Sequence, residues 1–197
     1  MLVPPVQELV RGRRWDLAER VYPQNLDDHD EEEASRLLED RRLQAAGLAK
    51  PHWFWTGVGK TTGEAASVEG STWKWRVDPE ALAALDVEDD GGRVAFLNPY
   101  DSLLFDRKRL EELFEFTYVL EQFKPKPQRR YGFFAHPILM GDRFVGMLEA
   151  EVDRDKKLLN VAAVHEFTGL DAEELEMVRA EIGELAEWLG VDLIEPR

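Results

Sequence analysis

Apolar residues recur at helical spacing early in the chain. The clearest run covers residues 31–46, where an acidic first turn precedes leucines and alanines three or four positions apart, and Gly47 ends the pattern. Three aspartates are candidate N-caps for this run: Asp27, Asp28 and Asp30. The pattern predicts helix through much of residues 13–47.

The pattern changes after Pro51. Residues 56–71 are rich in Gly, Thr and Ser, and residues 72–77 alternate between apolar and basic side chains. The apolar members of that alternation share one strand face: Trp73, Trp75 and Val77. A loop that leads into paired strands is therefore expected here.

A short helix is predicted next. Asp78 is a suitable cap, Pro79 suits the first helical position, and the apolar pattern runs to Leu85. Residues 86–92 then form a polar, acidic linker. Helix, loop, strand pair and short helix follow one another in the order typical of a winged helix.

Residues 93–165 are predicted to be mainly β-structure. Turn sequences separate short alternating runs, and one helix is expected at 107–114. The five predicted strands are 94–97, 116–123, 131–140, 144–152 and 158–164. Five short strands joined by tight turns favour a small antiparallel β-barrel.

The last segment has the pattern of an amphipathic helix. Asp171 is its expected cap and Gly190 its end. Its apolar stripe consists of Leu175, Val178, Ile182, Leu185 and Leu189. The predicted fold class is α+β, with a winged-helix-like domain and its linker at 1–92 and a barrel-like domain with a C-terminal helix at 93–197.

Composition narrows the classes of protein. The chain has 197 residues, of which 44% are hydrophobic, so it can form a packed core, and it has no cysteine. Disulfide scaffolds, cysteine nucleophiles and thiolate metal sites are thereby excluded. No apolar run approaches the roughly 20 residues of a membrane span, and the N-terminus lacks the pattern of a secretory signal. We expect a cytoplasmic protein without a membrane partner.

The charge is strongly uneven. The net charge is −15, but residues 93–165 carry 12 basic and 11 acidic groups, while the segments before and after them each carry −8. Overall acidity disfavours loose binding to nucleic acid. Residues 93–165 are close to neutral, so this objection does not apply to them. With 8 Lys beside 17 Arg, the acidity also fits a salt-adapted surface.

Several weak motifs favour ordinary structure. Residues 57–62 resemble the end of a phosphate-binding loop, but Phe54 stands where the pattern needs another glycine. The four histidines have no metal-ligand spacing, so no metal and no cofactor is expected. A cluster of tryptophans could stack on bases, but alternating aromatics are more often core: Trp53, Trp55, Trp73 and Trp75.

One loop carries four basic residues and no acid between two predicted strands. They are Lys124, Lys126, Arg129 and Arg130. Pro125 and Pro127 keep the loop extended, so its cations project outward. Such a loop suits phosphate oxygens, and a merely solvated hairpin loop is an equally good interpretation of the pattern alone.

Around this loop the chain resembles a known family. The matching stretches are Asn98-Pro99-Tyr100-Asp101, Phe105-Asp106-Arg107-Lys108-Arg109, Phe114-Glu115-Phe116-Thr117-Tyr118, Glu121-Gln122-Phe123-Lys124-Pro125, Arg130-Tyr131-Gly132-Phe133-Phe134, Pro137-Ile138-Leu139, Gly141-Asp142-Arg143-Phe144-Val145-Gly146 and Asp153-Arg154. In this order and spacing they resemble the winged-helix DNA glycosylases of crosslink repair, the AlkZ/YcaQ group. Upstream, residues 14–23 resemble that family's linker, so the resemblance covers roughly residues 13–165.

The resemblance implies tandem winged helices closed by a β-barrel, and hydrolysis of the N-glycosidic bond of alkylated purines without a metal. The family's catalytic motif is Q-x-Q or Q-x-D, and none of the five glutamines of this chain lies in either motif. We therefore predict no catalytic residue here. The predicted partners are double-stranded DNA and a separately encoded N-terminal half.

We predict that eight residues contact DNA: Arg107, Arg109, Lys124, Lys126, Arg129, Arg130, Tyr131 and His136. The six cations should lie exposed on one side. Asp101 and Asp106 are assigned to support of the site, either as a conceivable base or in structural pairs with Arg107 and Arg109.

Three functional hypotheses remain open at this point. The chain is the DNA-docking half of a crosslink-type glycosylase, a winged-helix DNA-binding regulator without chemistry, or a protein-interaction domain. The third is favoured if the basic residues of 107–130 are dispersed or paired with acids. We favour a DNA-repair protein that docks on DNA.

Overall fold

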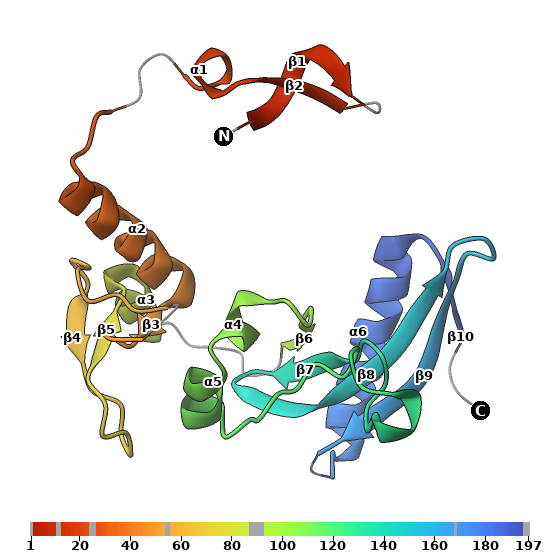
Figure 1. Cartoon of the computed structure of the whole chain (residues 1–197). Coiled ribbons are helices and arrows are strands. Elements are labelled where there is room, and N and C mark those ends of the chain that lie inside the picture. Colours follow the sequence, from red (N-terminus) through yellow and green to blue (C-terminus); the bar gives the residue numbers. More distant parts are fainter. Residues whose placement is uncertain are drawn as a thin grey trace. The chain divides into compact units, whose positions relative to one another are not determined.

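A computed structural model describes residues 2–10, 13–23, 27–53, 56–86, 93–167 and 169–194 (Figure 1). The chain divides into two compact units, residues 1–38 and 39–197. We describe each unit separately.

The first unit begins with a β-hairpin. Strand β1 (Leu2–Val10) pairs antiparallel with β2 (Arg13–Leu17), and a single-turn helix α1 (Ala18–Val21) follows. The helix expected from residue 13 onward is therefore wrong for β2. Pairing with β1, the strand just before it in the hairpin, satisfies the backbone of β2, and this pairing overrides the helical spacing.

Helix α2 (Glu31–Ala46) has the predicted bounds. Asp30 is the cap among the three candidates, because its carboxylate accepts a hydrogen bond from the Glu33 amide at 2.8 Å. Gly47 ends the helix with a φ of +67°, and its amide donates to the Leu43 carbonyl at 2.7 Å.

A small three-stranded antiparallel sheet follows in the second unit. Its strands are β3 (Leu48–Ala49), β4 (Glu64–Ala66) and β5 (Trp75–Val77), in the order β3-β5-β4. The predicted alternation is partly right, because Trp75 and Val77 are buried but Trp73 is 53% exposed and precedes the strand.

Helix α3 (Pro79–Ala83) begins as predicted. The Asp78 carboxylate accepts hydrogen bonds from the amides of Glu80 and Ala81, and a 3-10 turn at Ala84–Asp86 ends the segment. The acidic linker predicted at 86–92 lies outside the described residues from position 87 onward.

The larger sheet is mixed and curled. Its strands are β6 (Val94–Phe96), β7 (His136–Met140), β8 (Arg143–Asp153), β9 (Leu158–Glu166) and β10 (Asp192–Ile194), in the order β10-β9-β8-β7-β6. The first three pairings along the chain are antiparallel, whereas β10 is parallel to β9. Strands β6 and β10 are the edges of this half-barrel.

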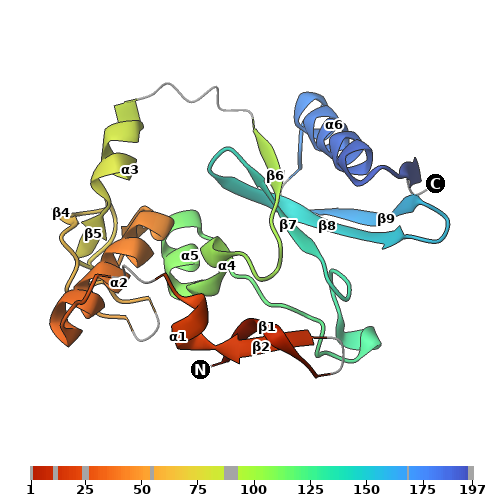
Figure 2. The same ribbon diagram turned by 90° about the horizontal axis from the view of Figure 1, so that it is seen from above.

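Helix α6 (Ala172–Leu189) covers one face of this sheet (Figure 2). Asp171 caps it with a full capping box, and Gly190 ends it in the left-handed conformation, as predicted. Val178 and Ile182 are 1% and 2% exposed in a core shared with Ile138 and Leu148 of the sheet. Val178, Ile182 and Leu185 of the predicted apolar stripe thus pack on the sheet, whereas Leu189 is 37% exposed.

Residues 116–123 are not a strand, contrary to prediction. Burial alternates over 116–120, since Phe116 and Tyr118 are buried while Val119 is exposed, but Glu121 is buried as well and no described strand pairs with this segment. The Phe116 ring stacks on Phe144 of β8 with 4.2 Å between ring centroids. The segment therefore packs on the sheet through side chains, and β10 is the fifth strand instead.

Helices α4 (Ser102–Phe105) and α5 (Arg107–Phe114) link β6 to this segment, and α5 has the predicted bounds. Buried contacts join this part to the region before residue 87. The Lys50 ammonium pairs with Glu112, and the Thr56 hydroxyl donates to Asp106 at 2.8 Å. The division of the chain into domains at residues 92 and 93 stays a prediction.

Candidate nucleic-acid interface

A buried carboxylate holds the basic loop in place. Glu121 is 7% exposed. It accepts hydrogen bonds from the amides of Arg130 and Tyr131 at 2.7 and 2.8 Å, and from the Lys124 ammonium at 2.7 Å. Burial disfavours the charged carboxylate, but these hydrogen bonds outweigh burial and hold the pKa of Glu121 below its usual value. Both ends of the loop are thus fixed on one group.

The loop opens with a tight turn. The Lys124 amide donates to the Glu121 carbonyl at 2.9 Å, which places Gln122 and Phe123 at the two central positions. The Gln122 amide group donates to the Tyr100 hydroxyl at 2.6 Å. Phe123 is 87% exposed.

The middle of the loop is a single 3-10 turn, η2 (Lys126–Gln128), with the exposed Pro125 before it and the exposed Pro127 within it. Arg129 folds back, because its Nε donates to the Lys124 carbonyl at 2.9 Å and its guanidinium lies 4.8 Å from the Phe133 ring centroid. The Arg130 guanidinium lies 4.9 Å from the ring centroid of Tyr131. The four predicted cations of the loop are therefore brought together on one ordered segment.

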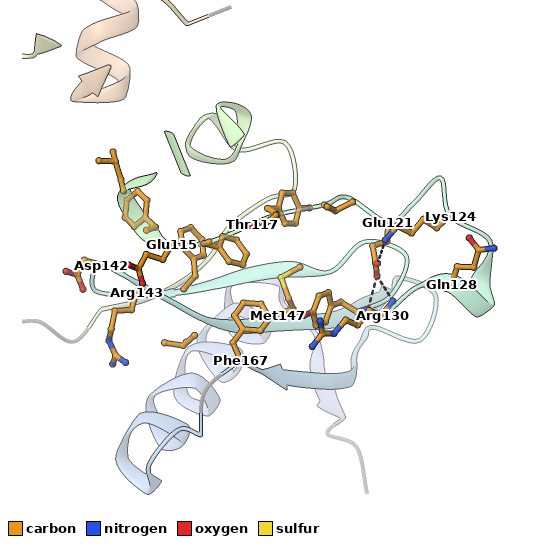
Figure 3. Close-up of a pocket in the computed structure, with 18 residues that line it drawn as sticks. Glu115, Thr117, Glu121, Lys124, Gln128, Arg130, Asp142, Arg143, Met147 and Phe167 are labelled. Carbon is orange, nitrogen blue, oxygen red and sulfur yellow. Dashed lines mark hydrogen bonds and ion pairs between the residues drawn. The ribbon is translucent and has the colours of Figure 1, made fainter. Parts of the chain in front are cut away.

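A groove of about 880 Å³ adjoins the loop. Six aromatic side chains line it: Phe114, Phe116, Tyr118, Tyr131, Phe144 and Phe167. Figure 3 shows Lys124, Gln128 and Arg130 at one end, and Asp142 and Arg143 at the other. The groove is therefore apolar along its length and charged at its ends.

The Tyr118 hydroxyl is buried in this groove wall without a hydrogen-bond partner among the described residues. Burial raises the pKa of Tyr118 to about 12, so the phenol stays protonated at neutral pH. Arg107 is exposed and stacks on the same ring at 4.8 Å, while it donates to the Tyr118 carbonyl. Arg107 thus lies beside the groove wall and not on the basic loop.

The prediction that Arg109 is exposed is wrong. Arg109 is 5% exposed, and its guanidinium donates to the Leu48 carbonyl at 3.0 Å. Burial lowers its pKa, against the attraction of Asp106. Arg109 joins α5 to β3 because its long side chain reaches the Leu48 carbonyl, and sequence spacing gives no sign of that contact.

The two candidate carboxylates are helix caps. Asp101 accepts a hydrogen bond from the Leu103 amide at 2.8 Å and caps α4. Asp106 is 5% exposed, caps α5 through the Arg109 amide at 3.0 Å, and accepts from Thr56. Both groups are therefore engaged in structural hydrogen bonds.

His136 and Tyr131 are half-buried. The His136 ring meets Phe134 edge-on at 5.6 Å, and burial lowers its pKa, so the ring is neutral at pH 7. Tyr131 meets His165 and Phe167 edge-on. Any contact of His136 with DNA would be made by a neutral ring.

The tryptophan cluster surrounds a buried lysine. The Lys50 ammonium is 3% exposed and lies 4.8 Å from the ring centroid of Trp73, 4.9 Å from that of Trp75 and 5.6 Å from that of Trp53. Trp53, Trp73 and Trp75 thus form a cage for this cation, and of these Trp75 is buried in the core. Trp55 lies outside the described residues.

The glycine-rich segment at 57–62 is a loop whose amides are already occupied. The Lys60 amide donates to Glu39 at 2.5 Å and the Thr62 amide to Asp40 at 2.7 Å. Carboxylates from α2 thus take the positions that a phosphate would need, which agrees with the interpretation of this segment as an ordinary loop.

The described residues contain neither a cluster suited to a metal ion nor a helix suited to a membrane. No described group of three or more acidic or histidine side chains is arranged to hold a metal ion. Among the described helices, none has the length and apolar character needed to cross a membrane.

Sequence reasoning missed three residues of this region. Glu121 was included in the predicted strand 116–123 without a role of its own, and Phe123 and Phe133, which are 87% and 55% exposed, were not assigned any role. The available signal was the position of Glu121 at the end of an alternating apolar run and just before the basic loop.

Comparison with known proteins shows which family the chain belongs to. Residues 1–188 match the family described as DNA glycosylase AlkZ-like, which is nearly the whole chain. The chain belongs to the AlkZ-like DNA glycosylase family. This AlkZ-like chain is also similar to the solved structure of Streptomyces sahachiroi DNA glycosylase AlkZ, with a TM-score of 0.55 and 16% identity.

That alignment covers 99% of the AlkZ-like chain described here and 54% of the Streptomyces protein. At this identity the likeness shows a shared fold. The chain spans about half the length of this structural relative, and it carries the basic loop and the groove within that half.

Proposed function

We propose that this AlkZ-like protein binds double-stranded DNA and acts as the DNA-docking part of a repair glycosylase. The observation that carries the proposal is the basic loop, where Glu121 fixes four cations on one ordered segment of an acidic protein. Lys126, Arg129 and Arg130 form no ion pair with an acid among the described contacts, so they remain available for phosphate oxygens.

We further propose that α2, the β3-β5-β4 sheet and α3 form a reduced winged helix. The described parts of residues 51–70 contain a loop and β4 but no helix, where a recognition helix would be expected. This segment therefore lacks the element that commonly enters the major groove. DNA contact is assigned to the basic loop instead.

Base excision would then require groups that this chain does not supply. The family's Q-x-Q and Q-x-D motifs are absent from the sequence, and the two candidate carboxylates cap helices. A partner segment that carries such a motif is proposed to provide the chemistry. Because its proposed partner is DNA, we propose a cytoplasmic location for the protein.

The test is the salt dependence of duplex binding. We compare the full chain with a variant in which Lys124, Lys126, Arg129 and Arg130 are all changed to Gln. A control variant removes four exposed cations elsewhere: Arg154, Lys156, Lys157 and Arg179. Each phosphate contact contributes a slope of about −0.9 in log affinity against log salt, so the loop variant should flatten that slope by about 3–4.

The control variant should keep the slope of the full chain within experimental error. Equal losses in both variants, or undiminished duplex affinity of the loop variant at low salt, would contradict docking through this loop. The second outcome favours the protein-interaction hypothesis. Circular dichroism of each variant checks that the fold is retained.

A further inference from the structure

One aromatic side chain at the interface has no apparent partner. Phe123 is 87% exposed, although an apolar ring of this size is stabilised by burial. Neither an aromatic contact nor a cation is recorded on its ring among the described residues, whereas Phe133 in the same region carries the Arg129 guanidinium. The role of Phe123 is therefore not explained by packing within the chain.

The backbone that carries Phe123 is braced on both sides. It occupies the third position of the turn closed by the 2.9 Å hydrogen bond between Lys124 and Glu121. Its neighbour Gln122 is anchored on Tyr100, and Glu121 accepts three hydrogen bonds. Because the turn is already ordered, insertion of the ring into a partner carries little additional loss of conformational entropy.

The surroundings of the ring favour an anionic partner with flat apolar surfaces. Residues 124–130 carry four cations and no acid, and the acid that precedes them, Glu121, is buried and accepts three hydrogen bonds. Trp188 is a useful comparison, since it is 81% exposed but lies in the segment 166–197, whose net charge is −8. Phe123 combines an exposed ring with local positive charge suited to nucleic acid, whereas Trp188 does not.

We propose that Phe123 is a wedge that enters the base stack of DNA and favours sites where bases are unpaired or easily unstacked. The proposal rests on the DNA docking proposed above. It adds a preference for a particular DNA structure, namely one with weakened base stacking. Phosphates on either side of the opened step would be held by Lys126 and Arg130, and the Phe123 ring would replace a lost base–base contact. Lesions that weaken stacking would then be the preferred sites.

The alternative occupant of an exposed ring is another protein. A phenylalanine surrounded by cations and prolines suits a nucleic acid better, since stacking requires a flat partner and the cations require phosphate. A protein partner would be indicated if removal of the ring had no effect on DNA.

The experiment uses duplexes with 2-aminopurine, whose fluorescence rises on unstacking, either fully paired or opposite a two-nucleotide mismatch. The full chain should raise the fluorescence at saturation and bind the mismatched duplex at least about fivefold more tightly than the paired one, consistent with the stacking contribution of one aromatic ring. Phe123→Ala should lose both effects but keep the salt slope of binding. Trp188→Ala is the matched control and should keep both effects.

The two proposals fail in distinguishable ways. If Phe123→Ala retains the fluorescence rise and the mismatch preference while the loop cations still govern the salt slope, the wedge is wrong and docking stands. If the loop cations do not govern the slope, docking itself is wrong. If the full chain saturates the duplex without any rise in fluorescence, the wedge is likewise overturned. Thermal melting of Phe123→Ala verifies folding, which an exposed position should not disturb.

Discussion

Single buried charges hold the interface of this protein in shape. Glu121 is the clearest case, because one carboxylate fixes two backbone amides and an ammonium group of the basic loop. A buried acceptor with satisfied donors stabilises a loop, and each donor left without its acceptor costs about 1–3 kcal/mol. The loop should therefore depend on Glu121 more than on any of its own cations.

The first prediction concerns the charge of Glu121. Its pKa lies below the usual value in the folded protein, so its stabilising contribution is complete above the unfolded pKa of about 4.3 and is lost as pH falls through the folded pKa. Glu121→Gln should lower the free energy of unfolding by about 1–3 kcal/mol at pH 7 and by much less near pH 3. Urea unfolding at both pH values measures this.

Asp153→Asn is the matched control for Glu121→Gln. Asp153 also accepts from a lysine, Lys156 at 2.8 Å, but in an exposed hairpin turn. Its replacement should affect stability less. An equal effect of the two substitutions would show that burial of Glu121 has no special importance.

The second prediction concerns the caged lysine. Lys50→Met removes the partner of Glu112 and the cation among the Trp rings. Removing one member of a buried pair costs roughly 3–5 kcal/mol, and we expect about 2 kcal/mol because Glu112 keeps the Ser71 hydroxyl as a donor. Urea unfolding followed by tryptophan emission measures this loss.

Two further variants test the cause. Glu112→Gln added to Lys50→Met should restore part of the loss, because the charge without its partner is gone. Lys108→Met removes an exposed cation 5.0 Å from the Trp53 centroid and should change little. Strict additivity of the Lys50 and Glu112 effects would mean that the pair is not coupled.

At the scale of elements, helix α6 shows how the backbone itself distinguishes two glycines. Gly190 has a φ of +67° and ends the helix, whereas Gly183 lies in the helix interior without a positive φ. A Cβ atom at either position would meet nothing within 4 Å. The two positions therefore have the same steric room for a side chain, and they differ only in backbone conformation.

The third prediction follows from this contrast. Gly190→Ala should destabilise the protein by about 1 kcal/mol, because an L side chain disfavours the left-handed region. Gly183→Ala should stabilise it by about 0.5–1 kcal/mol through helix propensity. Thermal melting of the two variants should show shifts of opposite sign, and shifts of the same sign would refute the conformational argument.

The elements that sequence patterns predicted well are those with strong local signals. Helices α2, α5 and α6 have caps and spacing that act within a few residues, and each begins and ends as expected. Strands β6, β8 and β9 were also located within about two residues. Local chemistry decided these elements.

The elements that were missed depend on contacts between distant residues. The run 116–120 alternates in burial like a strand, yet whether it joins a ladder depends on neighbouring strands, and β10 occupies the parallel edge instead. In the candidate site, the grouping of cations on the loop could be predicted, but the burial of Arg109 and Glu121 could not. Their partners lie in segments that sequence spacing does not relate to them.

At the scale of the whole molecule, acidity and DNA docking are compatible only if charge is segregated. The chain carries −15 in total, while the basic loop concentrates four cations in seven residues. Acidic surfaces elsewhere repel DNA, so binding should be restricted to the loop and strongly dependent on salt. This segregation suits a protein that contacts DNA at one defined site.

The last prediction is that this chain alone does not release bases. N-glycosidic hydrolysis needs a group that positions water and a group that stabilises the cationic sugar, and the available candidates are committed elsewhere. Asp101 and Asp106 cap helices, and His136 is neutral and half-buried at pH 7. The purified chain, incubated with duplex DNA that contains N7-alkylguanine, should produce abasic sites no faster than spontaneous depurination. Faster product formation that Asp101→Asn abolishes, in a variant that still folds, would place the chemistry in this half and overturn its assignment as a docking part.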